Sequence, residues 1–137
     1  MKNKYVKLTL VVGVIIKVKD KYLLVQERKK AYYGQWGWPT GRVEEGSTVK
    51  DHAIKEVRQE TGFKVKLTKE IGVFIGKKLK HAGVLFKGQI IGGKLRYPKK
   101  EIMDAKWFSE KEIIKIKNKL RSRWVLEGIN IIKKNAK

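Results

Sequence analysis

The chain has 137 residues, of which 42% are hydrophobic and 34% charged, a composition that suits one globular domain over residues 1–137 and excludes a disordered chain. Its formal net charge of +21 favours phosphate-containing partners such as nucleotides or nucleic acid, although lysines spread along the whole chain could serve only to keep the protein in solution. The absence of cysteine excludes disulfides and cysteine-ligated zinc and agrees with a reducing cytoplasm, where we expect the protein to act.

Two β-rich runs open the chain. Leu8–Val18 and Tyr22–Glu27 are predicted strands, and the turn-like KDK between them indicates a hairpin. Lysines before the first run resemble the start of a signal peptide, but the apolar part is too short to span a bilayer and no small-residue cleavage site follows it. We therefore expect a buried strand and no membrane partner.

A long loop and a helix come next. Residues 29–47 contain four glycines and Pro39, and a structured loop of this length is usually retained for function. Ser47 or Thr48 can cap a helix that runs to Thr61, and Gly62 is well placed at its C-terminal end.

The second half alternates strands and helices. It contains predicted strands at Lys64–Ile75, His81–Ile91 and Ile102–Phe108, with GKKLK joining the first two and IIGGKLRYP forming a turn before the third. SEKE matches a capping box and opens a helix from Ser109 to about Lys117, and a last helical segment covers Ser122–Ile132. Strands on both sides of a central helix predict a mixed α/β sandwich.

The central helix carries a group of polar side chains on one face. Glu56, Gln59 and Glu60 lie together because spacings of three and four residues share a helix face. Two carboxylates this close repel each other unless a cation joins them, and Mg²⁺ prefers a few carboxylates together with waters and substrate phosphates. A solvated helix surface has the same spacing, so the pair alone does not decide. His52, one turn earlier, is expected to be a solvated surface residue.

The surrounding sequence resembles the Nudix box. From Gly41 it reads GRVEEGSTVKDHAIKEVRQETGF, and the box reads glycine, five residues, glutamate, seven residues, then Arg-Glu-aliphatic-any-Glu-Glu-any-Gly-aliphatic. Gly41, Glu56, Val57, Glu60 and Gly62 match in register. The flanking WGWPTGRVEEG, EIMDAKWFS and VGVIIKVKDKYLLVQERK are also similar to family features. The resemblance covers roughly residues 8–116 and implies the Nudix-type α/β/α sandwich with a central mixed β-sheet.

This sequence departs from the box at four positions. Ser47 stands in place of its first glutamate, Lys55 in place of the arginine that orients the catalytic glutamate, and Gln59 in place of one metal-binding glutamate. Thr40 replaces the first glycine of the usual pair, where the family uses only a backbone carbonyl. Gln59 matters most, because its amide oxygen brings no negative charge to a hard cation.

The resemblance implies hydrolysis of a diphosphate chain by a metal-activated water. Glu56 and Glu60 would hold Mg²⁺ or Mn²⁺ with the Thr40 carbonyl and the Gln59 amide, and Glu56 or Glu101 would act as the base, although Glu101 could also be an exposed charge at a strand edge. Arg28, Lys29 and Gly41 are candidates for phosphate contacts. Aromatic side chains could stack on a base or pack the loop on the core; they are Tyr32, Tyr33, Trp36, Trp38, Tyr97 and Trp124.

Three functions remain open. The first is a pyrophosphohydrolase for a small nucleotide, which suits the size of the chain, and the second is an RNA 5′-pyrophosphohydrolase that uses the positive charge. The third is a nucleotide- or RNA-binding Nudix domain with weak or no catalysis, which the changes at Ser47, Lys55 and Gln59 motivate. Either a monomer or a homodimer fits the sequence.

Overall fold

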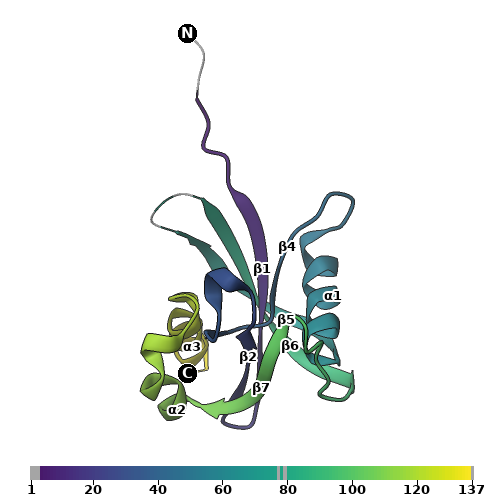
Figure 1. Cartoon of the computed structure of the whole chain (residues 1–137), viewed down its shortest axis with the longest axis vertical. Helices are drawn as coiled ribbons and strands as arrows, with labels where there is room; N and C mark the ends of the chain where they lie inside the picture. The colour runs from purple at the N-terminus through teal and green to yellow at the C-terminus, as the bar shows by residue number, and fades with distance from the viewer. Residues whose placement is uncertain (1–3, 77, 79, 137) are drawn as a thin grey trace.

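The protein is described by a computed structural model that covers residues 4–76, 78 and 80–136 (Figure 1). Its strands are β1 (Thr9–Val18), β2 (Lys21–Glu27), β3 (Trp36–Gly37), β4 (Thr40–Arg42), β5 (Phe63–Ile75), β6 (His81–Gly93) and β7 (Ile102–Ser109). Its helices are α1 (Val49–Thr61), α2 (Glu110–Lys115) and α3 (Trp124–Asn135), and short 3-10 turns cover η1 (Lys30–Tyr32) and η2 (Lys117–Lys119).

The strands of the described chain form a mixed sheet. Its main order is β3-β2-β1-β6-β5, with β4 paired to β1 and β7 paired to β2. β1 and β6 are parallel from Thr9↔His81 to Ile16↔Gly88, whereas the other pairs are antiparallel. The predicted hairpin of β1 and β2 is confirmed, but only Lys17 and Val18 of β1 take part in it. The rest of β1 lies at the centre of the sheet between β4 and β6.

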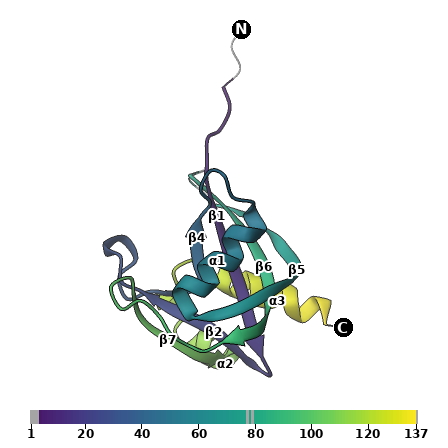
Figure 2. The same ribbon diagram turned by 90° about the vertical axis from the view of Figure 1, so that its right-hand side faces the viewer.

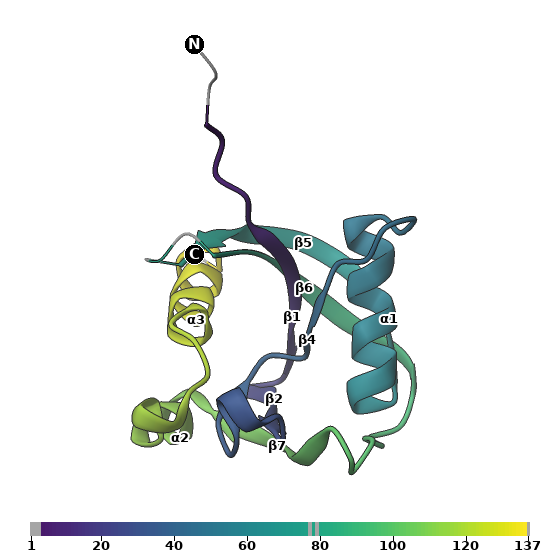
Figure 3. The same ribbon diagram turned by 45° about the horizontal axis from the view of Figure 1, so that its top comes forward.

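Helices cover both faces of this sheet (Figure 3). The central strand is buried on both sides because its apolar residues alternate between two cores: Val12, Val14 and Ile16 pack with α1, and Ile15 packs with α2 and α3. Figure 2 shows α1 lying across the sheet with α3 behind it. The predicted α/β/α sandwich is confirmed.

Most predicted boundaries agree with the structure to within about two residues. The clearest difference is the predicted turn IIGGKLRYP, because β6 continues to Gly93, where Gly92 and Gly93 still pair with β5. Gly93 has a φ of 79°, and glycine adopts this left-handed conformation without steric cost. The connection predicted at GKKLK includes residues 77 and 79, which lie outside the described chain. Among the described helices, none is long and apolar enough to cross a membrane.

Candidate active site

Capping at both ends fixes helix α1 in place. The Thr48 side chain accepts a hydrogen bond from the Asp51 N–H at 3.0 Å, so Thr48 and not Ser47 is the N-cap. Gly62 ends the helix in the left-handed conformation, as predicted. Between the caps, Ala53, Val57 and Thr61 are buried. Glu56 and Glu60 each come one position before a buried residue, so both carboxylates lie at the boundary of the core.

Glu60 is the most buried carboxylate of the helix, with a relative exposure of 8%. It accepts a hydrogen bond at 2.9 Å from the backbone N–H of Thr40, the first residue of β4. Burial raises the pKa of Glu60 to about 8, and the negative charges of Glu56 and Glu27 act in the same direction. The Thr40 hydrogen bond and the positive charge of Arg121 lower this pKa but do not cancel the effect of burial.

Glu56 lies against Gly41, also in β4. A Cβ atom on Gly41 would overlap the Glu56 carboxyl group, so the absence of a side chain on Gly41 makes room for this carboxylate. Burial raises the pKa of Glu56, and the charge of Glu101 adds to the rise, while the charges of His52 and Lys55 oppose it. Two carboxylates with raised pKa values therefore face the backbone of the same short strand.

His52 does not lie where the sequence predicted it. The prediction of a solvated surface residue is wrong, because His52 is 1% exposed. Its Nε2 lies 3.2 Å from Glu56 Oε1, yet this atom makes no hydrogen bond of acceptable geometry. His52 thus lies one helical turn before Glu56 and is buried beside the Glu56 carboxylate.

A partly buried ion pair between Glu27 and Arg121, which the sequence did not reveal, lies near Glu60. Glu27, at the end of β2, is 4% exposed and accepts a hydrogen bond at 3.2 Å from Arg121 Nη1. The Arg121 guanidinium also lies 4.4 Å from the centre of the Tyr32 ring. The backbone N–H of Arg121 donates to the Trp36 carbonyl at 2.8 Å. Arg121 therefore ties the C-terminal segment to the loop that enters the site.

Charged loop residues lie near this cluster. Glu101 is exposed, its backbone carbonyl accepts from the Arg28 N–H at 3.1 Å, and its charge acts on Glu56. Lys29 is exposed too, and its positive charge lowers the pKa of Glu56. The structure thus brings the β2 end and the β7 start, which carry predicted substrate and base residues, to the same side as the carboxylates.

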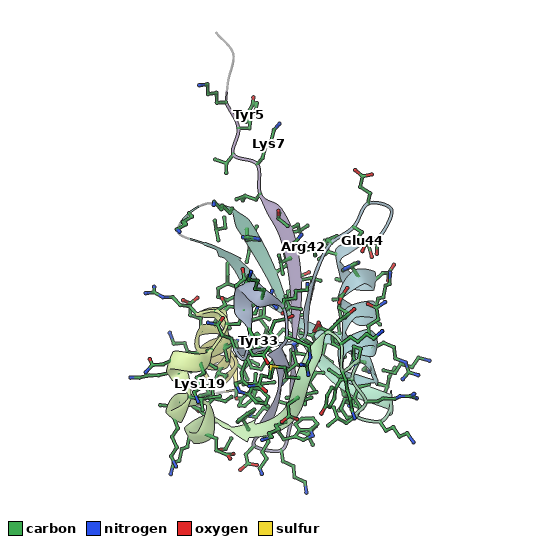
Figure 4. All side chains as sticks on the ribbon, viewed as in Figure 1. Tyr5, Lys7, Tyr33, Arg42, Glu44 and Lys119 are labelled. Carbon is green, nitrogen blue, oxygen red and sulfur yellow. The ribbon has the colours of Figure 1, made fainter. Side chains whose placement is uncertain are left out.

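Of the two roles that the sequence left open for Trp36, Trp38 and Trp124, the structure has packing in the core. Trp38 is 1% exposed and its indole N–H donates to the Trp124 carbonyl at 3.2 Å, while Trp124 itself is 7% exposed. Trp36 is 8% exposed and packs edge-to-face on Phe108, with 5.0 Å between the ring centres. These rings pack in the core, which was the alternative to stacking. Tyr33 is exposed, and Figure 4 shows it on the loop between β2 and β3.

Three of the four departures from the box lie on the exposed side of the site. Ser47, Lys55 and Gln59 are all exposed, and Gln59 lines a groove beside Arg58. Thr40 is buried, but its contribution to Glu60 comes from the backbone N–H, which any residue except proline supplies.

The donor set fits a hard divalent cation that is shared with a phosphate ligand. Within the described residues, no three His, Asp or Glu side chains form a complete set of metal ligands. Glu56 and Glu60 are oxygen donors whose pKa values are raised chiefly by burial, and the Thr40 carbonyl lies on the strand that both contact. Mg²⁺ commonly binds one or two carboxylates and completes its shell with waters and phosphates.

The comparison with known proteins places this chain in a family. A model described as the NUDIX domain matches residues 7–127, and the chain therefore belongs to the NUDIX family, as the box indicated.

Several relatives and solved structures are similar to this chain. Putative nudix hydrolase 1 of Caenorhabditis elegans is 33% identical over 105 residues, which are 74% of this chain and 28% of that protein. The putative 8-oxo-dGTP diphosphatase of Bacillus subtilis (strain 168) is 32% identical over 96 residues, 70% of this chain and 63% of that protein. The chain thus spans less than two thirds of either relative. A NUDIX hydrolase structure from Nitrosomonas europaea is 26% identical, with a TM-score of 0.81, and covers 94% of this chain and 90% of its own.

Proposed function

We propose that this chain is a Mg²⁺-dependent (or Mn²⁺-dependent) pyrophosphohydrolase that cleaves a diphosphate bond in a nucleoside triphosphate or another nucleoside diphosphate derivative. The observation that carries this proposal is the pair of carboxylates, Glu56 and Glu60, held against β4 with raised pKa values. The similarity to the putative 8-oxo-dGTP diphosphatase of Bacillus subtilis supports the same reaction class. A cytoplasmic location stays a prediction.

In this proposal each part of the site has one task. Glu56, Glu60 and the Thr40 carbonyl would hold the cation, and the exposed Gln59 amide would join them from the solvent side. The bound cation supplies positive charge to the phosphate oxygens and acidity to a water molecule. Glu101 takes the proton from the attacking water, and its position in the turn just before β7 leaves it in solvent, where it can release that proton.

The remaining residues shape the site or bind phosphate. Arg28 and Lys29 are exposed beside it and attract the phosphate chain. Gly41 makes room for Glu56, and Gly62 fixes the end of α1. Ser47 and Lys55 lie in solvent at the positions of an acidic and a basic residue of the box.

The test is a hydrolysis screen with Mg²⁺ and Mn²⁺ over nucleoside triphosphates, dinucleotides and 5′-triphosphate RNA. Glu60→Gln should lower turnover of the best substrate by about 100-fold or more, because it removes the most buried carboxylate ligand. Glu44→Gln is the matched control, since it removes the same charge from the exposed loop before α1 (Figure 4). Nucleotide binding without turnover on any substrate would overturn the enzyme and favour a binding domain. Equal turnover in Glu60→Gln would assign the activity to another site.

A further inference from the structure

A second feature of α1 is a groove at its C-terminal end. It has a volume of about 710 Å³ and is lined by two glycines and by the side chains of Arg58, Gln59, Lys94, Arg96, Tyr97 and Pro98. These residues come from the last turns of α1 and from the connection between β6 and β7, which passes the end of the helix (Figure 3). The proposed hydrolysis uses only Gln59 and the helix cap at Gly62 among them.

Backbone contacts build this groove. The Arg96 N–H donates to the Thr61 carbonyl at 2.7 Å, and Arg58 Nη1 donates to the Gly62 carbonyl at 2.6 Å. Gly62 and Gly93 both have a φ of 79°, and a Cβ on Gly93 would overlap the Gly62 carbonyl. The connection is therefore held against the helix end. The contact to Gly62 engages one of the five N–H donors of the Arg58 guanidinium.

The charge of the groove has one sign. Arg58, Lys94 and Arg96 are exposed cations, and no carboxylate is among the lining residues that the structure describes. Two more exposed lysines, Lys99 and Lys100, continue along the same connection up to Glu101 beside the candidate active site. Such a row of cations attracts a chain of phosphates more strongly than a single phosphate.

The position of the groove relative to the carboxylates suits an extended ligand. Glu56 and Gly62 are six positions apart on one helix, a rise of about 9 Å along the axis, so the groove lies within two turns of the active-site carboxylates. The half-buried Tyr97 also lines it, while its ring packs against the core beside α1 and its hydroxyl donates to Asp104 Oδ1 at 3.4 Å. Cations that follow a backbone, together with an aromatic ring for a base, are the features by which proteins bind single-stranded nucleic acid.

We propose that this groove binds the phosphate backbone of a single-stranded nucleic acid, with a base on Tyr97. This goes beyond the proposed hydrolysis, because it requires neither a metal nor turnover. It also gives a physical reason for the uncharged side chain of Gln59, since a carboxylate at this position would add a negative charge to the lining of an anion-binding groove.

The test measures binding of a fluorescent oligouridylate of about ten nucleotides by anisotropy, with EDTA present so that no metal contributes. Arg58→Gln/Lys94→Gln/Arg96→Gln is compared with Lys111→Gln/Lys115→Gln/Lys119→Gln. Each triple variant removes three positive charges from the formal +21, but the second set lies on and just after α2, and Figure 4 shows Lys119 on the opposite side of the molecule from α1. The groove variant should bind about tenfold more weakly or worse, and its salt slope should fall by about two.

A second pair of variants changes no charge and tests the groove even if the triple variant does not fold. Tyr97→Leu should weaken binding by about tenfold because stacking is lost, whereas Tyr97→Phe should bind like the natural chain. Equal losses of affinity in the two triple variants would overturn the proposal that the groove binds the oligonucleotide and would assign binding to the overall charge. Uridine monophosphate that competes as well as the oligonucleotide, at equal concentration, would also overturn it, in favour of a mononucleotide site.

Discussion

The two sides of helix α1 differ in burial and charge. The side that faces β4 carries His52, Glu56 and Glu60, all buried or half-buried, and the pKa values of both glutamates are raised. The outer side carries Lys55, Arg58 and Gln59, all exposed.

This difference separates the parts of the box that this chain keeps from those it changes. Burial raises the pKa values of the two matching carboxylates, whereas three of the four altered positions, Ser47, Lys55 and Gln59, face solvent. Glu56 and Glu60, which match the box, thus lie on the inner side of α1, and the changes at Lys55 and Gln59 lie on its outer side, where the basic groove begins.

The largest expected effect on the inner side is the loss of stability when the ion pair between Glu27 and Arg121 is removed. Arg121→Ala leaves Glu27, which is 4% exposed, without its cation and should lower the free energy of unfolding by about 3 kcal/mol. Urea denaturation measures the loss. Arg123→Ala, an exposed arginine two residues away, is the control and should change stability by less than about 0.5 kcal/mol. Similar losses in both variants would contradict a special role for the Glu27 pair.

A substitution in β4 tests whether the inner side needs space for Glu56. Gly41→Ala places a methyl group where the Glu56 carboxyl lies, so that carboxylate must leave its position and turnover should fall by about 100-fold. Steady-state kinetics on the best substrate from the screen measures this. Gly76→Ala is the control, since a Cβ there meets no atom within 4 Å. Full activity in Gly41→Ala would mean that Glu56 is not needed where the structure places it.

The inner side should also make the stability of the protein depend on pH, because it contains the buried carboxyl group of Glu60. The folded-state pKa of Glu60 is raised to about 8, so the folded chain keeps this proton after the unfolded chain has lost it. This contribution to stability is full below the unfolded pKa and is lost as the pH rises through about 8. Without metal, the free energy of unfolding should therefore fall by about 2 kcal/mol between pH 6 and 8.

Thermal or urea denaturation in EDTA measures this slope. Glu60→Gln should remove most of it, because glutamine does not titrate, whereas Glu44→Gln should retain it. Added Mg²⁺ should stabilise the natural chain more at pH 8 than at pH 6, since the ion competes with the proton. A slope that is unchanged in Glu60→Gln would show that another group is responsible.

The smallest expected effect lies on the outer side. Gln59→Glu restores the carboxylate of the box and should raise turnover at limiting Mg²⁺ by a few-fold, because it adds charge to the metal site. The same variant should weaken oligonucleotide binding by about threefold, because it adds that charge to the groove. Kinetics and anisotropy on one preparation measure both, with Gln89→Glu, an exposed glutamine of β6, as the control. An increase in both properties would contradict this account.

Local patterns in the sequence predicted most of the fold. Strand alternation, the cap at Thr48, the capping box at Ser109 and the glycine at position 62 depend on neighbouring residues, and the structure has each of them. The spacing of Glu56 and Glu60 likewise placed them on one side of a helix.

Features that depend on distant contacts were missed. Glu27 looks like the polar end of a strand, and nothing near it in the sequence points to Arg121, 94 residues later. His52 is polar, and its burial follows only from the packing of α1 on β1 and β4. The tryptophans could bind a base or fill the core, and only the position of α3 over the sheet decides between these uses.

The parallel pairing of β1 with β6 has a consequence for the order of folding. The strand at the centre of the sheet finds its main partner only after α1 and β5 have been synthesised, and contacts this far apart in the chain form slowly. Until then, the carboxylates of α1 remain hydrated and ionise near their ordinary pKa. The buried environment of Glu56 and Glu60 therefore forms only after residues beyond the box have been made, and a ribosome-bound chain ending before β6 should contain the complete box and yet lack this environment.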